Sequence, residues 1–241
     1  MSKRNDHLVL ICGISGTGKS VSLMNLKNPE GVMYLNTEAG KRLPFNSKFK
    51  EYTITDPYQI TEAFTHAETK KDIHTIVIDS LVMMMDMFES KHIIGSDNTM
   101  QGWGDYAQFF KNLMNQSVAS STKNIIFTSH VMDILNEKEM SLERLIKVKG
   151  SLMNTSIEAF FSVVVAAKKM PLEKLKDYEN DLLIITEEDK LLGFKHVFQV
   201  KLTKETVNER IRGPIGMWAR NETFIDNDAQ KLMDRLHEYY A

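Results

Sequence analysis

The chain has 241 residues, of which 42% are hydrophobic and 26% are charged, so it can bury a large core and is most simply one globular domain over residues 1–241. Thirty basic and 32 acidic side chains leave a net charge of −2, which excludes a polyanion partner held by overall charge alone. Any contact with nucleic acid then requires a local patch.

The single cysteine and the short apolar runs are typical of a protein of the cytoplasm. Cys12 cannot form an internal disulfide and ends the apolar stretch LVLIC, so we expect a buried thiol on a strand in a reducing cytoplasm. That stretch is too short for a signal peptide, and no later run approaches the roughly 18 residues that cross a bilayer. We expect a soluble cytoplasmic protein with no membrane partner.

In chain order, strand-like and helix-like segments alternate. Short apolar runs predict strands at 8–12, 31–35, 75–78, 124–128, 160–166 and 197–202. Helix-length segments lie at 19–26, 57–70, 81–91 and 106–120, and apolar residues at helical spacing predict a last helix within 226–240. The alternation predicts an α/β fold, with a mainly parallel central sheet and helices on both faces. Segments 94–105 and 132–150 lack apolar periodicity and are predicted to be functional loops.

The first predicted strand is followed by GISGTGKS, which fits the pattern G-x-x-x-x-G-K-[ST] between a strand and a helix. Glycines let the backbone N–H groups wrap round phosphates, and the lysine neutralises phosphate oxygens. The predicted phosphate-binding residues are Gly13, Ser15, Gly16, Thr17, Gly18, Lys19, Ser20 and Val21. Because no N-K-x-D segment indicates guanine specificity, ATP is the expected nucleotide.

A carboxylate follows the strand of HTIVIDS. Asp79 is expected to hold Mg²⁺ together with the hydroxyl of Ser20. The alternative for Asp79 is a helix cap. Hydrolysis also needs a group that activates water, and Ser80 occupies the position after the metal Asp where many P-loop ATPases carry a Glu. Glu38, in YLNTEAG after the second strand, is the candidate base; its alternative is a solvent-exposed loop carboxylate.

The order GISGTGKS, YLNTEAG and IVIDS resembles the RecA family of recombinases. The resemblance implies a RecA-like P-loop NTPase core in which Glu38 activates water and Lys19 acts in catalysis. It also implies that His130 stands where a polar side chain senses the γ-phosphate, with a structural histidine as the alternative.

The resemblance extends less specifically to residues outside the nucleotide site. Segments 92–105 and 131–150 fall where RecA-like proteins carry DNA-binding loops, and the residues available there for stacking or phosphate contact are Trp103, Arg144, Lys147 and Lys149. Solvated charged loops are the alternative. Lys201 and Lys204 match lysines that reach the ATP of a neighbouring subunit, and Arg210 or Arg212 could serve instead; the alternative for the lysines is an exposed edge strand.

The match covers about residues 8–216 and leaves no room for the extra terminal parts of bacterial RecA. The compact core is similar to phage nucleotide-binding ATPases related to single-strand annealing recombinases. This likeness implies a DNA-dependent ATPase in recombination, annealing or repair, located in the host cytoplasm. The expected partners are single-stranded DNA, further copies of the chain in a ring or filament, and a single-strand binding protein. A nucleotide-gated binding module or a P-loop kinase are the alternatives, although no Arg-rich lid is visible.

Overall fold

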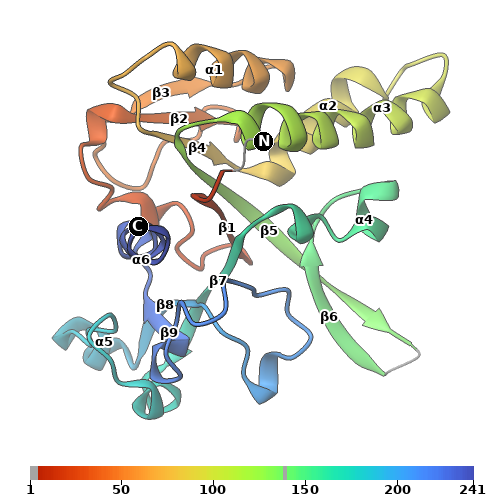
Figure 1. Cartoon of the computed structure of the whole chain (residues 1–241). Coiled ribbons are helices and arrows are strands. Elements are labelled where there is room, and N and C mark those ends of the chain that lie inside the picture. The colour runs from red at the N-terminus through yellow and green to blue at the C-terminus, as the bar shows by residue number, and fades with distance from the viewer. Residues whose placement is uncertain (1–4, 138–139) are drawn as a thin grey trace.

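The computed structural model describes residues 5–137 and 140–241, so residues 138–139 of the second predicted loop lie outside the described residues. Within these ranges the chain forms a sheet in the order β3-β2-β4-β5-β1-β7-β8-β9, with β6 paired to β5 (Figure 1). The strands are β1 (Leu8–Gly13), β2 (Val32–Asn36), β3 (Lys50–Thr53), β4 (Thr75–Asp79), β5 (Asn124–Asn136), β6 (Ser141–Ile146), β7 (Val163–Pro171), β8 (Phe194–Gln199) and β9 (Phe224–Asp226).

The sheet is mainly parallel. All neighbours from β3 to β7 pair in parallel, whereas β8, β9 and β6 pair antiparallel. In register, Gly13 at the end of β1 lies opposite His130 of β5, and Asn36 at the end of β2 lies opposite Asp79 of β4. The carboxyl ends of β1, β2 and β4 therefore meet at one edge, which β5 passes at His130, and this is the edge where α/β proteins place their ligands.

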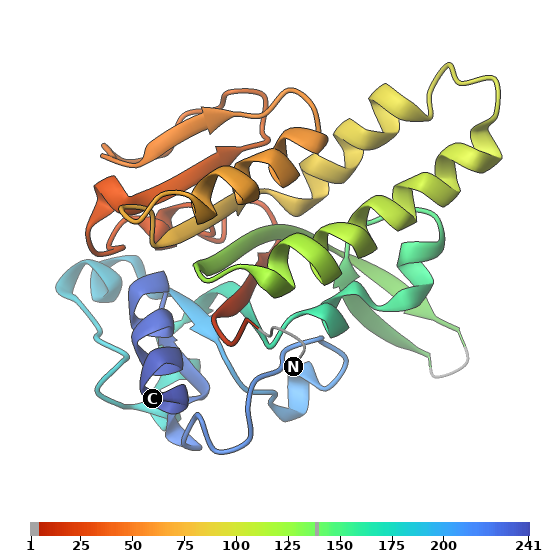
Figure 2. The same cartoon turned by 45° about the horizontal axis from the view of Figure 1, so that its top comes forward.

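Each buried strand contributes to both faces of the sheet because its side chains alternate. In β1, Leu8 and Leu10 join one core, and Val9 and Ile11 join the other. The first core is covered by α1 (Tyr58–Glu68), α2 (Leu81–His92) and α3 (Thr99–Asn112), and the second by α6 (Ala229–Tyr240) (Figures 1 and 2). Of two further short helices, α4 (Ser151–Thr155) adds Leu152 to the first core, whereas α5 (Glu187–Leu192) has no buried residue. The predicted α/β class, with helices on both faces of a mainly parallel sheet, is confirmed.

The α-helix predicted at 19–26 does not form. Only a 3₁₀ turn forms, over Val21–Leu23. The hydroxyl of Ser22 donates to the carbonyl of Lys19 at 2.6 Å, a local bond that competes with the helical ladder. Pro29, which begins the next 3₁₀ turn, has no N–H to extend a helix from this side.

The first predicted loop, 94–105, is largely helical. Asn98 caps α3, and its Oδ1 accepts from the N–H of Gln101 at 3.1 Å. The helix continues into a π-helical turn over Leu113–Val118. Figure 2 shows α2 and α3, in yellow and yellow-green, as a helical hairpin that projects from the sheet.

The second predicted loop, 132–150, is largely a β-hairpin. β5 continues to Asn136 and pairs with β6, with Asp133 opposite Arg144 and Leu135 opposite Leu142. The mixture of charged and apolar residues hid this pairing, because neither face of the hairpin is uniformly apolar. No helix among the described residues is long and apolar enough to cross a membrane.

Candidate functional site

The glycine-rich loop between β1 and the 3₁₀ turn has a backbone that only glycine adopts readily. Gly16 and Gly18 have φ of 77° and 90°. A Cβ on Gly13 would lie 2.6 Å from Thr17 Oγ1 and 2.7 Å from the carbonyl oxygen of Ala167. The loop is thus a tight backbone cradle of the kind that holds phosphate groups.

Lys19 arches back over this loop. The residue is only 7% exposed, and its Nζ donates to the carbonyls of Gly13 at 3.0 Å and Ile14 at 2.9 Å. Burial lowers the pKa of Lys19, while Asp79 and Glu38 act in the opposite direction. The ammonium therefore lies beside the cradle, between the loop and two carboxylates.

Asp79 is the centre of a buried hydroxyl cluster. It is 2% exposed, and its carboxylate accepts from Ser20 Oγ at 2.8 Å, from Tyr34 Oη at 2.8 Å and from the hydroxyl of Thr128. The peptide bond from Asp79 to Ser80 is cis. Burial is the largest cause that raises the pKa of Tyr34, followed by Asp79, so the phenol stays a donor. The predicted metal ligands Ser20 and Asp79 are thus in contact with each other. The Asp79 side chain does not cap α2.

Glu38 lies just beyond β2 between the Lys41 ammonium and the His130 imidazole. Lys41 Nζ is 2.8 Å from its Oε2, and His130 Nε2 is 3.7 Å from its Oε1. The imidazole of His130 is the largest cause that lowers the pKa of Glu38, to about 2; burial opposes the shift and Lys41 adds to it. Glu38 is only 15% exposed as a side chain, so it is a held carboxylate and not a solvated loop residue.

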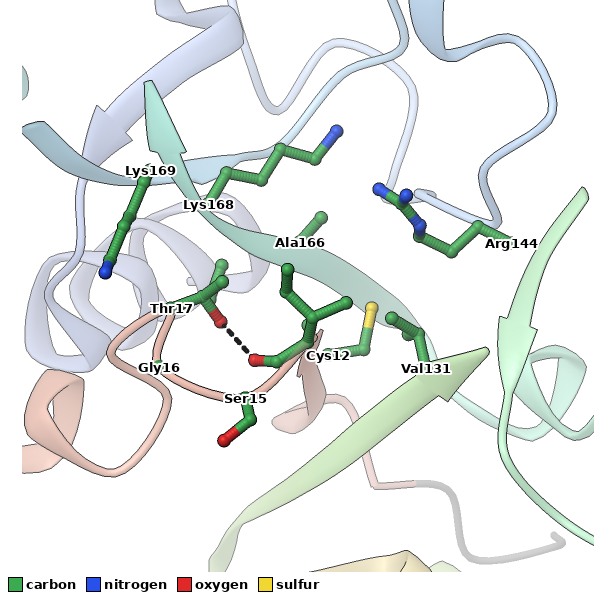
Figure 3. A pocket seen from close by; sticks show the side chains of 12 residues that line it. Cys12, Ser15, Gly16, Thr17, Val131, Arg144, Ala166, Lys168 and Lys169 are labelled. Carbon is green, nitrogen blue, oxygen red and sulfur yellow. Dashed lines mark hydrogen bonds between the residues drawn. The ribbon is translucent and has the colours of Figure 1, made fainter. Parts of the chain in front are cut away.

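Two cavities flank the glycine-rich loop. One, of about 200 Å³, is lined by Lys19, Ser20, Glu38, Asp79 and His130, and it extends to residues 41–44. The other, of about 290 Å³, lies on the far side of the loop. Figure 3 shows it, with Arg144 and Lys168 from separate strands at its rim and the hydroxyl of Thr17 bonded to Ile14. The smaller cavity contains the predicted catalytic and metal-binding groups together and is the functional candidate.

The four residues predicted to act across a subunit boundary lie away from this cavity. Lys201 donates to the carbonyl of Trp218 at 3.1 Å, and Arg210 pairs with Glu143 at 2.8 Å. Arg212 is exposed and pairs through its backbone with Val164, and Lys204 is exposed in a 3₁₀ turn. None of the four lines either cavity beside the loop.

Most of the residues predicted to meet DNA are engaged within the chain. Arg144 pairs with Asp133 at 2.8 Å and Glu209 at 3.2 Å. Lys149 pairs with Glu89 and Asp86. Trp103 is half-buried on α3, packs against the first core and contacts Tyr106 with ring centroids 5.4 Å apart. Lys147 is exposed. The two ion-paired residues therefore offer less positive charge than their sequence suggests.

Several groups at the site were not found from the sequence. Tyr34 and Thr128 orient Asp79, and Lys41 holds Glu38. His196 and Asn227 contact the outer side of the glycine-rich loop from the last part of the chain. A strand end marks Thr128, but nothing local marks His196 or Asn227.

The fold and the site together define a class. A parallel sheet with a glycine-rich loop after β1, a lysine and serine within it and a buried aspartate after β4 is the arrangement of a P-loop nucleotide-binding protein. The family model described as AAA domain matches residues 6–192, and the chain belongs to this family of P-loop ATPase domains. Among curated proteins, none matches the chain. The match ends just before β8, so β8, β9 and α6 lie beyond it.

Proposed function

We propose that the protein is a Mg²⁺-dependent ATPase in which Lys19 binds the β- and γ-phosphates and Glu38 activates the attacking water. The observation that supports it most is the convergence of Lys19, Ser20, Asp79 and Glu38 on one cavity. Lys19 and the backbone N–H groups of the cradle bind phosphate, and Glu38 accepts the proton of the water that attacks the γ-phosphorus as ADP leaves.

The donor set fits magnesium. Ser20 Oγ and Asp79 Oδ2 are 2.8 Å apart, and both are oxygen atoms, the ligands that Mg²⁺ prefers. No group of three or more His, Cys, Asp or Glu side chains in the described part of the chain could hold a metal by itself, so a metal here depends on the phosphates. Ser20 and Asp79 would hold Mg²⁺, which would offset the negative charge of the phosphate oxygens. Tyr34 and Thr128 keep Asp79 oriented.

Glu38 must be released before it can act as a base. A carboxylate with a pKa of about 2 holds a proton poorly, and the His130 imidazole 3.7 Å away, together with the hydrogen bond from Lys41, causes that low value. Lys41 and His130 both lie on the cavity wall, so a γ-phosphate would attract the Lys41 ammonium away from Glu38 and would offer His130 another hydrogen-bond acceptor. The proposed role of His130 is therefore double: it restrains Glu38 without nucleotide and donates to the phosphate with it.

The pH dependence of stability tests this restraint. Because the pKa of Glu38 is lowered from 4.5 to about 2 on folding, its contribution to stability is complete above pH 4.5 and is lost as pH falls toward 2. When the pH is lowered from 5 to 3, the Tm of Glu38→Gln should therefore fall less than the Tm of the native protein, by a few degrees. Thermal unfolding followed by circular dichroism measures this difference; equal losses would contradict the restraint.

We further propose that hydrolysis depends on assembly and on single-stranded DNA, as the RecA resemblance implies. Three apolar residues in or just after the phosphate cradle are exposed to solvent: Ile14, Val21 and Met24 are 55%, 44% and 52% exposed. Contact with another copy of the chain would bury these side chains. Lys201, Lys204, Arg210 or Arg212 of a neighbouring copy would then reach the γ-phosphate, and Lys147 remains available to DNA.

The rate per subunit tests this dependence. Specific ATPase activity should rise with protein concentration and rise further when single-stranded DNA is added, because a complete site needs two subunits. A double-stranded DNA of equal length is the control. A specific rate that is constant across concentrations and indifferent to DNA would rule out both couplings.

A further inference from the structure

Two side chains from the last part of the chain contact the outer side of the phosphate cradle. His196 of β8 lies with Nδ1 3.1 Å from the carbonyl oxygen of Thr17, and Asn227, between β9 and α6, donates from Nδ2 to the carbonyl oxygen of Gly18 at 2.9 Å. A Cβ on Gly18 would lie 2.6 Å from Asn227 Nδ2 and 3.2 Å from His196 Nδ1. Both side chains therefore press against the loop itself.

These contacts set the direction of two backbone N–H groups. The carbonyl of Thr17 shares a peptide plane with the N–H of Gly18, and the carbonyl of Gly18 shares one with the N–H of Lys19. In a planar trans peptide the C=O and N–H point in opposite directions. Holding both carbonyls outward thus turns the N–H groups of Gly18 and Lys19 toward the opposite side of the chain, where the cradle receives phosphate.

The loop needs such support from outside. Gly18 has φ of 90° and little intrinsic preference between peptide orientations, and the turn that follows is 3₁₀ and only three residues long. Its carbonyl also accepts from the N–H of Ser22 at 2.9 Å, so Asn227 adds a second restraint there. A regular α-helix would restrain the loop by itself, but this chain has none directly after it.

The chemistry of Asn227 points to its donor as the functional atom. Its other amide atom, Oδ1, is buried and has no hydrogen-bond partner among the described residues. For His196, a carbonyl oxygen only accepts, so the contact with Thr17 requires the tautomer with its proton on Nδ1. Each side chain thus presents an N–H to a loop carbonyl.

We infer that His196 and Asn227 are positioning residues for phosphate binding, which fix the two peptide planes of the cradle from outside. The inference rests on the proposed nucleotide site. Both residues lie beyond residues 6–192, so the part of the chain that the family match does not cover completes the phosphate cradle.

Four variants test the inference in two matched pairs. Asn227→Leu and His196→Phe keep the approximate shape of each side chain and remove the donor, whereas Asn227→Gln and His196→Gln keep a donor. Calorimetric titration with Mg·ADP and with the non-hydrolysable Mg·AMP-PNP should show affinity weakened about tenfold or more in the first pair. The second pair should recover most of that loss. In steady state, KM for ATP should rise more than kcat falls.

Asp234→Ala is the control for a general loosening of α6. Asp234 pairs with Lys27 beyond the 3₁₀ turn at 2.9 Å and does not contact the cradle. This variant should lower Tm and keep nucleotide affinity, whereas Asn227→Leu should weaken affinity more than its Tm predicts. Affinity within twofold of native in both donor-less variants would overturn the inference alone. A native protein that binds neither nucleotide would overturn the nucleotide site as well.

Discussion

Replacing Glu38 with Gln should lower steady-state ATP hydrolysis by about 10²- to 10⁴-fold while leaving the affinity for Mg·ATP within a few-fold of native, because the change removes the proton acceptor and keeps the shape. The cradle, Lys19 and the pair of Ser20 and Asp79 are untouched. Phosphate release measures the rate, and calorimetric titration with Mg·AMP-PNP measures the affinity.

Glu62→Gln is the matched control, since Glu62 is an exposed carboxylate on α1 that lies outside the nucleotide cavity. It should hydrolyse ATP at the native rate. An unchanged rate in Glu38→Gln would show that another group activates the water. A native protein that binds ATP without turnover would instead favour a nucleotide-gated binding module, and transfer of phosphate to an added acceptor would favour a kinase.

Replacing Lys19 with Met should weaken Mg·ATP binding by about 10²-fold, which corresponds to about 2.7 kcal/mol, because the ammonium that neutralises the phosphates is lost. Met retains most of the apolar stem and so fills the buried space. The stability of the nucleotide-free protein should change less, since the carbonyls of Gly13 and Ile14 lose a donor while the cost of burying a charge also disappears.

The control for Lys19→Met is Lys48→Met, which removes an exposed lysine paired only loosely with Glu30 at 3.3 Å. Nucleotide affinity is measured at two ionic strengths, so that general charge effects are separated from a local contact. Native affinity in Lys19→Met would mean that the cradle backbone alone holds the phosphates.

The core of the site could be predicted because its signals are local. Gly13, Gly18, Lys19 and Ser20 lie within eight residues, and Asp79 follows an apolar strand whose carboxyl end must meet that of β1. Local patterns also predicted segments that overlap the six strands β1, β2, β4, β5, β7 and β8, although β7 and β8 are displaced by about three residues, and the helices at 57–70 and 81–91. Glu38 was a candidate because it follows the second predicted strand, and the resemblance favoured it further; it lines the same cavity as Lys19 and Asp79.

The remaining features depend on contacts that no local pattern encodes. His196 and Asn227 meet the cradle across 179 and 209 residues of chain. Arg144 was predicted to be available for phosphate contact, but in the folded chain it forms ion pairs with Asp133 and Glu209. The turn after the cradle also packs Leu23 and Leu26 into the second core beside α6, so its apolar residues look the same in the sequence as those of a helix.

β5 links the wall of the nucleotide cavity to the projecting hairpin within a single strand. The strand passes His130 in the cavity wall and continues without a break to Asn136 in the projecting hairpin. Six residues at about 3.3 Å each give this extension a length of roughly 20 Å. A displacement of His130 on nucleotide binding would therefore reach the hairpin through the backbone of one strand, with no loop in between.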